Sequence, residues 1–418
     1  MTINKSEILV GLSGGIKSFI AAYILQKQGH RVKALAITNF SQDYHMFNLP
    51  QKRYGGIVDE KIDLYPKLLE SFGIISSTAD LENAKKFCKM LGIDLVETKA
   101  IDQYFGQVID KFIESKLTGN VFDYSLYLQN FFIEVLTEKA NNLNIKKIAT
   151  GHFAKISLHE SSKVFLLGMG QEKNKDQSSM LALVAQQYLS RLELPLAEMS
   201  EAAVIKLSGK LNLPTRKKTS NEDNHLEQFM SQLCERITPP KLRQPGRIVD
   251  AGTGAVLKEH NGIYNYSVGE LVKFEQDLNT TKSMQVVRSE YQKGNIFVMP
   301  KDDSKTKRIS LACFVNLSDL CLRKPFNSFI KLTTSDELFS CVVYPKSAST
   351  VLVELTEHIK WPVGKGQVIL LVNENQQILG RGKVQDIPLF SSTSFIEEQK
   401  DEVENYLSRL LAPQNTKL

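Results

Sequence analysis

The chain has 418 residues, of which 42% are hydrophobic and 23% charged, and its formal net charge is +6. This length predicts roughly two or three globular domains, and the sequence contains neither a membrane-spanning apolar run nor the apolar segment of a signal peptide. The modest positive charge is compatible with a polyanionic partner such as RNA but does not demand one.

The first predicted strand, residues 7–12, ends in Ser-Gly-Gly and leads into a helical pattern over residues 16–28. This arrangement is typical of a phosphate cradle, because glycines let backbone N–H groups approach an anion and the helix N-terminus is partially positive. We therefore expect a nucleotide triphosphate or pyrophosphate here. The residues expected to contact it lie in this loop or at neighbouring strand ends: Gly11, Leu12, Ser13, Gly14, Gly15, Lys17, Ser18, Ile37 and Gly151.

Strand and helix patterns then alternate along the first half of the chain. The predicted strands cover residues 31–38, 94–98 and 146–150, and the predicted helices cover 79–91, 103–116 and 126–144. This rhythm predicts a parallel α/β sheet with crossover connections. Ligands bind beyond the carboxyl ends of such strands, where Gly151 and His152 would lie beside the Ser-Gly-Gly loop. We interpret His152 as a residue that orients this loop rather than as a general base.

The pattern changes after about residue 200. Helices are predicted over residues 201–211 and 225–236, and a Pro-rich break follows. From Gly246 to Val372 short strand-like runs alternate with turns, which predicts two small barrels or sheets. An amphipathic helix is predicted over residues 394–411. Residues 41–76 interrupt the first half and are interpreted as an insertion over the sheet edge.

Several motifs occur in an order that resembles one known family. They are Ser13-Gly14-Gly15, Thr150 to Lys155, Ser77 to Asp80, Lys173 to Ser178, Leu213-Pro214-Thr215, Pro245 to Asp250, Glu259 to Gly262 and Gly364 to Gln367. Each is weakly diagnostic, whereas the ordered set is strong evidence of kinship. The chain resembles the tRNA-uridine 2-sulfurtransferases, or tRNA-specific 2-thiouridylases.

The resemblance implies an architecture for the whole chain. Residues 1–200 would form an N-type ATP pyrophosphatase (PP-loop, adenine nucleotide alpha hydrolase-like) domain with a parallel sheet. Residues 201–300 would form a small central domain of the tRNA-binding kind, and residues 301–418 a C-terminal β-barrel with a terminal helix. ATP is the implied cofactor and tRNA the implied partner, with neither DNA nor a membrane involved, and the cytoplasm is the expected location.

The resemblance also implies a chemistry: ATP adenylates the wobble uridine, and a persulfide carried on one of two cysteines then supplies sulfur. Where the family has aspartate in its phosphate loop, this chain has Lys17. Lysine removes an oxygen ligand for Mg²⁺ and no metal site is expected, although its ammonium group is able to contact phosphate directly. Two interpretations stay open: Lys17 contacts phosphate, or it points to solvent.

Both family cysteine positions carry amides, Gln129 and Asn224. An amide has no thiolate to serve as a nucleophile and cannot carry persulfide sulfur. The chain's own cysteines are scattered and form no Cys-x-x-Cys pair, which favours a reducing compartment, and each is expected to be a buried small hydrophobe. They are Cys88, Cys234, Cys313, Cys321 and Cys341.

Contact with tRNA is predicted to be retained only in part. Lys175, Asp176 and Gln177 match a tRNA-contacting loop of the family, and Arg216-Lys217-Lys218 is a further basic cluster. The family's Lys-x-Arg-Tyr-Arg element appears here as Lys331 to Ser335, which lacks two arginines and an aromatic ring and weakens phosphate pairing and stacking.

Three hypotheses follow from these residues. The chain is a degenerate thiouridylase-like protein (a pseudoenzyme) that binds nucleotide and tRNA, or an ATP-dependent tRNA-modifying enzyme that uses a non-protein nucleophile. The third hypothesis is an active tRNA-uridine 2-sulfurtransferase with relocated cysteines.

Overall fold

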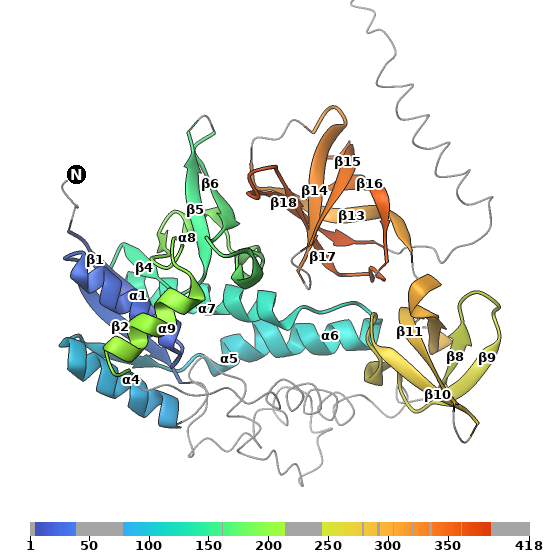
Figure 1. Cartoon of the computed structure of the whole chain (residues 1–418), viewed down its shortest axis with the longest axis horizontal. Helices are drawn as coiled ribbons and strands as arrows, with labels where there is room; N and C mark the ends of the chain where they lie inside the picture. The colour runs from blue at the N-terminus through green and yellow to red at the C-terminus, as the bar shows by residue number, and fades with distance from the viewer. Residues whose placement is uncertain are drawn as a thin grey trace, which may run out of the picture.

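The structure is a computed structural model that describes residues 5–38, 78–213 and 245–385, apart from short gaps at 161, 278–279, 291–292, 304, 319–321, 334–336 and 361. Within these ranges lie a five-stranded sheet, a second five-stranded sheet, a closed six-stranded barrel and a two-stranded hairpin (Figure 1). The predictions for residues 41–76, 216–218, 225–236 and 394–411, and for Asn224, lie outside the described residues.

The first sheet has the strand order β3-β2-β1-β4-β7, and all of its pairs are parallel. This confirms the parallel α/β prediction. Its strands are β1 (Glu7–Leu12), β2 (Arg31–Ile37), β3 (Leu95–Thr98), β4 (Lys147–Ala149) and β7 (Leu192–Glu193). Both faces of the central strand β1 are covered, as expected of a parallel sheet, which explains its unbroken apolar sequence.

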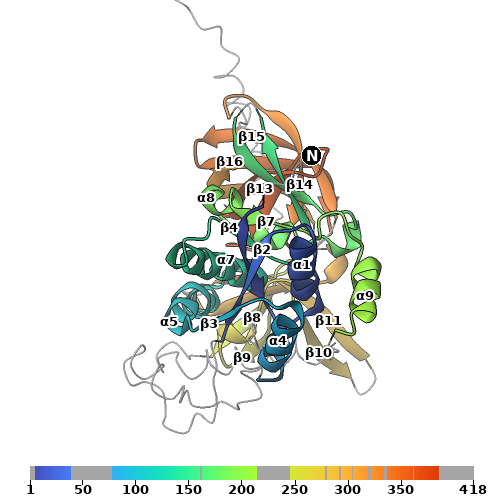
Figure 2. The ribbon, with the colours of Figure 1, turned by 90° about the vertical axis from the view of Figure 1, so that its left-hand side faces the viewer.

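Helices cover the two faces of this sheet. Alternate side chains of β1 point to opposite faces, so Leu9 joins one core cluster and Ile8 and Val10 join another. The Leu9 side is covered by α5 (Ile101–Tyr104), a π-helical turn (Phe105–Ile109), α6 (Asp110–Thr118) and α7 (Tyr124–Asn142). The other side is covered by α1 (Ile16–Lys27), α4 (Thr78–Leu91) and α9 (Glu201–Lys210), as Figure 2 shows.

Helix α9 belongs structurally with the first sheet. The sequence assigned residues 201–300 to a central domain, yet Val204 and Leu213 pack into the same cluster as α1. The apolar stripe of this short helix needs a partner, and α1 supplies it.

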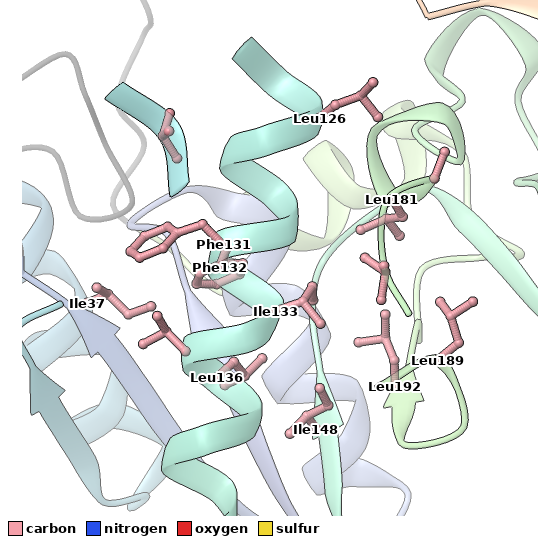
Figure 3. Close-up of a cluster of buried hydrophobic side chains, with 14 of the residues drawn as sticks. Ile37, Leu126, Phe131, Phe132, Ile133, Leu136, Ile148, Leu181, Leu189 and Leu192 are labelled. Atoms are coloured by element: carbon pink, nitrogen blue, oxygen red, sulfur yellow. The ribbon is translucent and has the colours of Figure 1, made fainter. Parts of the chain in front are cut away.

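Helix α7 is the main covering element on the Leu9 side. Phe131, Phe132, Ile133 and Leu136 on α7 meet Ile37 and Ile148 of the sheet (Figure 3). The same cluster extends to Leu181, Leu189 and Leu192, which follow the hairpin in sequence. Three short helices follow the two-stranded hairpin in the chain and precede β7. They are Lys173–Lys175, Ser179–Leu181 and α8 (Gln186–Leu189).

The second sheet has the order β10-β11-β12-β8-β9. Its strands are β8 (Gly246–Asp250), β9 (Val256–His260), β10 (Leu271–Asp277), β11 (Thr280–Glu290) and β12 (Asn295–Met299). Short 3₁₀ turns lie at Ile263–Asn265 and Lys301–Asp303. Ile248, Met284 and Ile296 form part of its small core.

The barrel closes in the order β13-β16-β15-β14-β17-β18. Its strands are β13 (Thr306–Asn316), β14 (Phe326–Leu332), β15 (Leu338–Ser347), β16 (Thr350–Ile359), β17 (Val368–Val372) and β18 (Ile378–Val384). The prediction of two small β structures after Gly246 is therefore confirmed as one sheet and one barrel.

The barrel packs against the first half of the chain. Ile369 and Leu371 of β17 lie in the barrel core, whereas Val368 and Leu370 join the cluster built around α7. The hairpin of β5 (Ala154–His159) and β6 (Val164–Met169), which the sequence did not predict, lies beside β18 in Figure 1. Across this contact, Nε2 of Gln377 donates to Oγ of Ser157 at 2.9 Å. In the described part of the chain, no helix has the length and apolar character needed to cross a membrane.

Candidate functional site

The Ser-Gly-Gly loop lies where β1 ends and α1 begins. Gly15 is the N-cap of α1 and has extended backbone angles, whereas Gly14 has φ +74°, a conformation that favours glycine. Oγ of Ser18 donates to the Gly15 carbonyl at 2.8 Å and accepts from the Ser13 amide at 3.3 Å. These bonds fix the loop from within, and the positive end of α1 faces it.

Close packing brings two distant residues against this loop. A Cβ at Gly14 would lie 2.6 Å from Cβ of Asp80, the buried carboxylate in the first turn of α4. A Cβ at Gly151 would lie 2.6 Å from the backbone carbonyl carbon of Lys17. The structure thus joins Gly151 to the loop, as the sequence analysis expected, and adds Asp80.

Three residues of the predicted nucleotide set have a supporting position instead. The side chains of Leu12 and Ile37 are fully buried. A Cβ at Gly11 would lie 2.4 Å from Cζ of Phe132, so the α7 ring packs directly on the β1 backbone there. These three residues shape the floor of the loop, and ligand contact by their backbone stays a prediction.

Lys17 makes specific contacts inside the molecule. Its Nζ donates to Oε1 of Gln177 at 2.8 Å and lies 5.1 Å from the centre of the Phe153 ring. The interpretation that Lys17 points to solvent is therefore wrong. The same Gln177 oxygen accepts from the Phe153 amide at 3.1 Å, so the lysine is held by a carbonyl group that is itself fixed.

His152 is buried between the strand end and the phosphate loop. Its Nδ1 pairs with Oγ1 of Thr150 at 2.8 Å. Burial, with a smaller contribution from the positive charge of Lys17, lowers the pKa of His152 from 6.5 to about 3. The imidazole is therefore neutral at physiological pH and hydrogen-bonds within its own Thr150–His152 turn, while its role in orienting the phosphate loop stays a prediction.

Acid is expected to destabilise the protein through His152. Between about pH 6.5 and 3 the unfolded chain binds a proton here that the folded chain does not, so stability falls as the pH falls. The slope from this group is about 1.4 kcal/mol per pH unit. We expect His152→Gln to lose this component when urea unfolding is measured at pH 7, 6 and 5. Equal slopes for the two proteins would contradict the assignment.

The predicted tRNA-contacting residues have different surroundings. The Asp176 side chain is fully buried, and its Oδ2 lies 2.6 Å from Nζ of Lys331, which is only 2% exposed. The Gln177 oxygen is occupied by Lys17 and Phe153. Lys175 is exposed and pairs with Glu201 at 2.7 Å. Lys175 is thus accessible to solvent, whereas the carboxylate of Asp176 is enclosed in the fold.

The position of the family's first cysteine lies on α7. Gln129 is in the second turn of this helix, half-buried and one turn before Phe132. Asp123 caps the helix, accepting from the Leu126 amide at 3.2 Å. The segment from Tyr124 onward is therefore regular helix, which agrees with the absence of the family's prolines.

Two of the three described cysteines, Cys88 and Cys341, offer little nucleophilic character. Burial raises the pKa of Cys88 and that of Cys341 to about 12, which confirms them as buried thiols. Cys313 is exposed on β13, so the expectation that it is buried was wrong. Cys234 and Cys321 lie outside the described residues. Within the described ranges, no cluster of three or more His, Cys, Asp or Glu side chains is arranged to hold a metal ion.

Sequence reasoning missed three contributors to this site. Asp80 lay in a recognised motif, and Phe153 followed Thr-Gly-His, yet nothing in their local pattern pointed to the phosphate loop. Lys331 was compared only with a motif for RNA contact, although its flanking residues Ile330 and Leu332 face the barrel core. Because neighbouring strand residues point to opposite faces, Lys331 lies on the outer face of the barrel. This alternation is the one sequence signal that indicated where Lys331 points.

Comparison with known proteins agrees with this geometry. The family model of the tRNA methyl transferase HUP domain matches residues 6–224, slightly more than half of the chain. The tRNA-specific 2-thiouridylase MnmA of Endomicrobium trichonymphae is 25% identical over 384 residues, which cover 91% of this chain and 99% of that protein. The corresponding protein of Mycoplasma mycoides subsp. mycoides SC is 27% identical over 316 residues, covering 75% and 79%.

Similarity to solved structures is weaker. The U34-tRNA thiolase NcsA from Methanococcus maripaludis overlays with a TM-score of 0.30 at 15% identity, covering 56% of this chain and 67% of that one. The family assignment therefore depends on the sequence matches and on the parallel sheet. The chain belongs to the tRNA-specific 2-thiouridylase family, and residues 6–224 are its tRNA methyl transferase HUP domain.

Proposed function

We propose that this chain is a cytoplasmic, tRNA-binding member of the thiouridylase family that binds nucleotide but does not thiolate tRNA by the cysteine persulfide route. The observation that carries the proposal is the replacement of the reactive groups at three positions of the family pattern. Lys17 occupies the acidic position of the phosphate loop, and amides occupy positions 129 and 224.

The loop has the features that a nucleotide phosphate requires. Gly14 and Gly151 leave no room for side chains, so backbone groups remain available for close approach, and α1 directs its N-terminus at the loop. Among the described residues, no side chain caps the first turn of α1. ATP bound here would be held by the Ser13–Ser18 segment, with the Lys17 ammonium offsetting phosphate charge.

A catalytic Mg²⁺ fits this loop poorly. Lys17 places a positive charge where the family has a carboxylate, and an ammonium group repels a divalent cation instead of ligating it. The nearby carboxylate of Asp80 is buried against Gly14. We therefore infer that nucleotide binds here without a metal ion.

Transfer of sulfur lacks a carrier at the expected positions. Gln129 is an amide on a regular helix, and Cys88 and Cys341 are buried thiols with raised pKa values. Neither an amide nor a buried thiol is a good acceptor of sulfane sulfur. Binding of tRNA is supported by the family and by the exposed Lys175, although fewer basic and aromatic groups are present than in the family pattern.

Genetic complementation tests the sulfur half of the proposal. We expect this chain, expressed in a bacterial strain lacking its thiouridylase, to leave wobble 2-thiouridine undetectable by mass spectrometry of total tRNA. The Endomicrobium trichonymphae relative serves as the positive control in the same vector. Restored 2-thiouridine that is lost again in Cys234→Ser would contradict the proposal and indicate relocated thiols.

A second candidate is supported by the intact phosphate loop. An ATP-dependent tRNA-modifying enzyme would adenylate its substrate, and an external nucleophile such as sulfide or an amine would then attack it. ATP–pyrophosphate exchange in the presence of tRNA separates the two candidates. The binding protein gives no exchange above a blank, whereas the enzyme gives exchange that Gly14→Glu abolishes by filling the cradle.

A further inference from the structure

We infer that Gln177 is a positioning residue for Lys17, and that its loop couples the phosphate site to the C-terminal barrel. The coupling loop is defined here as residues 173–178. This inference depends on the nucleotide binding proposed above, and it concerns a lysine that replaces the family's acidic residue.

The first link joins the coupling loop to the phosphate site. Nζ of Lys17 donates to Oε1 of Gln177 at 2.8 Å, across 160 residues of sequence. Two hydrogen bonds in turn fix Gln177 to Phe153. The backbone N–H of Gln177 donates to the Phe153 carbonyl at 2.8 Å, and the side-chain Oε1 of Gln177 accepts from the backbone N–H of Phe153 at 3.1 Å. A change in the backbone at Gln177 therefore changes the position of the Lys17 ammonium group.

The second link joins the same loop to the barrel. Asp176, the neighbour of Gln177, contacts Lys331 of β14 at 2.6 Å, and both side chains are buried. The carboxylate also accepts from the Ser178 amide at 3.1 Å, from the Ser178 hydroxyl at 2.7 Å and from the Gly170 amide at 3.4 Å. A buried charge with this many donors occupies one position, so the loop follows any displacement of Lys331.

The barrel face that carries Lys331 is itself an interface. Lys331 is opposite Leu370 in the β14–β17 register, and Leu370 packs into the core cluster around α7. A force that shifts the barrel, such as RNA bound to it, is thus transmitted by the ion pair to Gln177 and then to Lys17. Because binding couplings are reciprocal, phosphate that draws Lys17 away from Gln177 also alters the barrel contact.

Nucleotide binding is the first test. We use ATP without added metal and isothermal titration calorimetry on the full chain. Gln177→Ala, and the charge-neutral pair Asp176→Asn with Lys331→Met, are each expected to change the ATP dissociation constant by about fivefold or more. Lys383→Met is the matched control, since this barrel lysine also contacts the first half of the chain, 3.1 Å from the Tyr127 hydroxyl, but does not touch the coupling loop. Its ATP affinity should stay within about twofold of the wild type.

Chemical labelling of Lys17 in the absence of nucleotide tests the coupling independently of the proposed nucleotide binding. Acylation of Lys17 by acetic anhydride, followed by peptide mass spectrometry, should be faster in Gln177→Ala and in the Asp176→Asn, Lys331→Met pair than in Lys383→Met. Ser178→Ala, a milder change that removes one donor to Asp176, covers the case in which the pair variant does not fold.

The outcomes are distinct. If wild-type protein binds no ATP but Lys17 labelling responds to the barrel variants, the proposed nucleotide binding fails while the coupling stands. If Gln177→Ala accelerates labelling and neither the pair variant nor Ser178→Ala does, the connection ends at Gln177 and coupling to the barrel is overturned.

Discussion

Replacing Lys331 by methionine is expected to lower the free energy of unfolding by about 3–5 kcal/mol, because it leaves a buried carboxylate without its counter-ion. The Asp176 side chain is fully enclosed and Lys331 is 2% exposed, so water cannot replace the lost ammonium group. Equilibrium urea unfolding followed by circular dichroism measures the change.

Two control variants isolate the cause of this loss. Adding Asp176→Asn to Lys331→Met removes the unpaired charge and should recover most of the stability, since the amide still accepts hydrogen bonds from the loop. Lys155→Met breaks the Lys155–Glu198 pair, which has the short distance of 2.7 Å but side chains that are 56% and 71% exposed. That variant should change stability by about 1 kcal/mol or less. A Lys331→Met protein as stable as Lys155→Met would show that the buried pair contributes nothing.

Gly151→Ala is expected to distort the phosphate loop. The new Cβ would lie 2.6 Å from the Lys17 carbonyl carbon and 2.7 Å from the Ser18 amide nitrogen, so the first turn of α1 must move. Both groups are backbone, and no side-chain rotation relieves the contact. We expect a loss of about 1–3 kcal/mol in stability. We also expect ATP to bind more weakly by about tenfold, which corresponds to roughly 1.4 kcal/mol.

The matched control for this substitution is Gly209→Ala on α9. A Cβ at Gly209 meets nothing within 4 Å, so the change should stabilise the helix by up to about 1 kcal/mol. Thermal unfolding of both variants and ATP titration of both provide the comparison. If Gly151→Ala behaves like Gly209→Ala in both measurements, the loop tolerates a side chain and the close approach has no functional importance.

Much of the first sheet was predictable from local pattern. Strand β1 matched its predicted range, Glu7–Leu12, because an unbroken apolar run before Ser-Gly-Gly is characteristic of a strand buried on both faces. The β5–β6 hairpin was missed although Ala154–His159 alternates apolar and polar residues and Val164–Met169 is an apolar run. Its stability derives from the first sheet's domain and the barrel beside it, which no local window contains.

Some features of the candidate site were likewise predictable from the sequence, and others were not. Glycines at positions 14 and 151 were singled out from the sequence because a phosphate loop needs backbone approach, and both prove to be tightly packed. The exposure of Cys313 was not predicted, because strict alternation from the buried Ile309 and Leu311 would place it inside the barrel. The register of β13 against β18 shifts between Ala312 and Val315, and Cys313 has φ +49°, so the alternation is broken at this residue.

The sequence by itself determined the chemical groups: an ammonium at position 17, amides at 129 and 224, and a strand–loop–helix able to cradle phosphate. Only the tertiary structure decided their partners. Lys17 meets Gln177 across 160 residues, and Asp176 meets Lys331 across 155. The first pair lies within the first half of the chain, and the second depends on how the barrel packs against that half. A local pattern can indicate which face of an element a side chain occupies, whereas its partner and its burial depend on long-range packing.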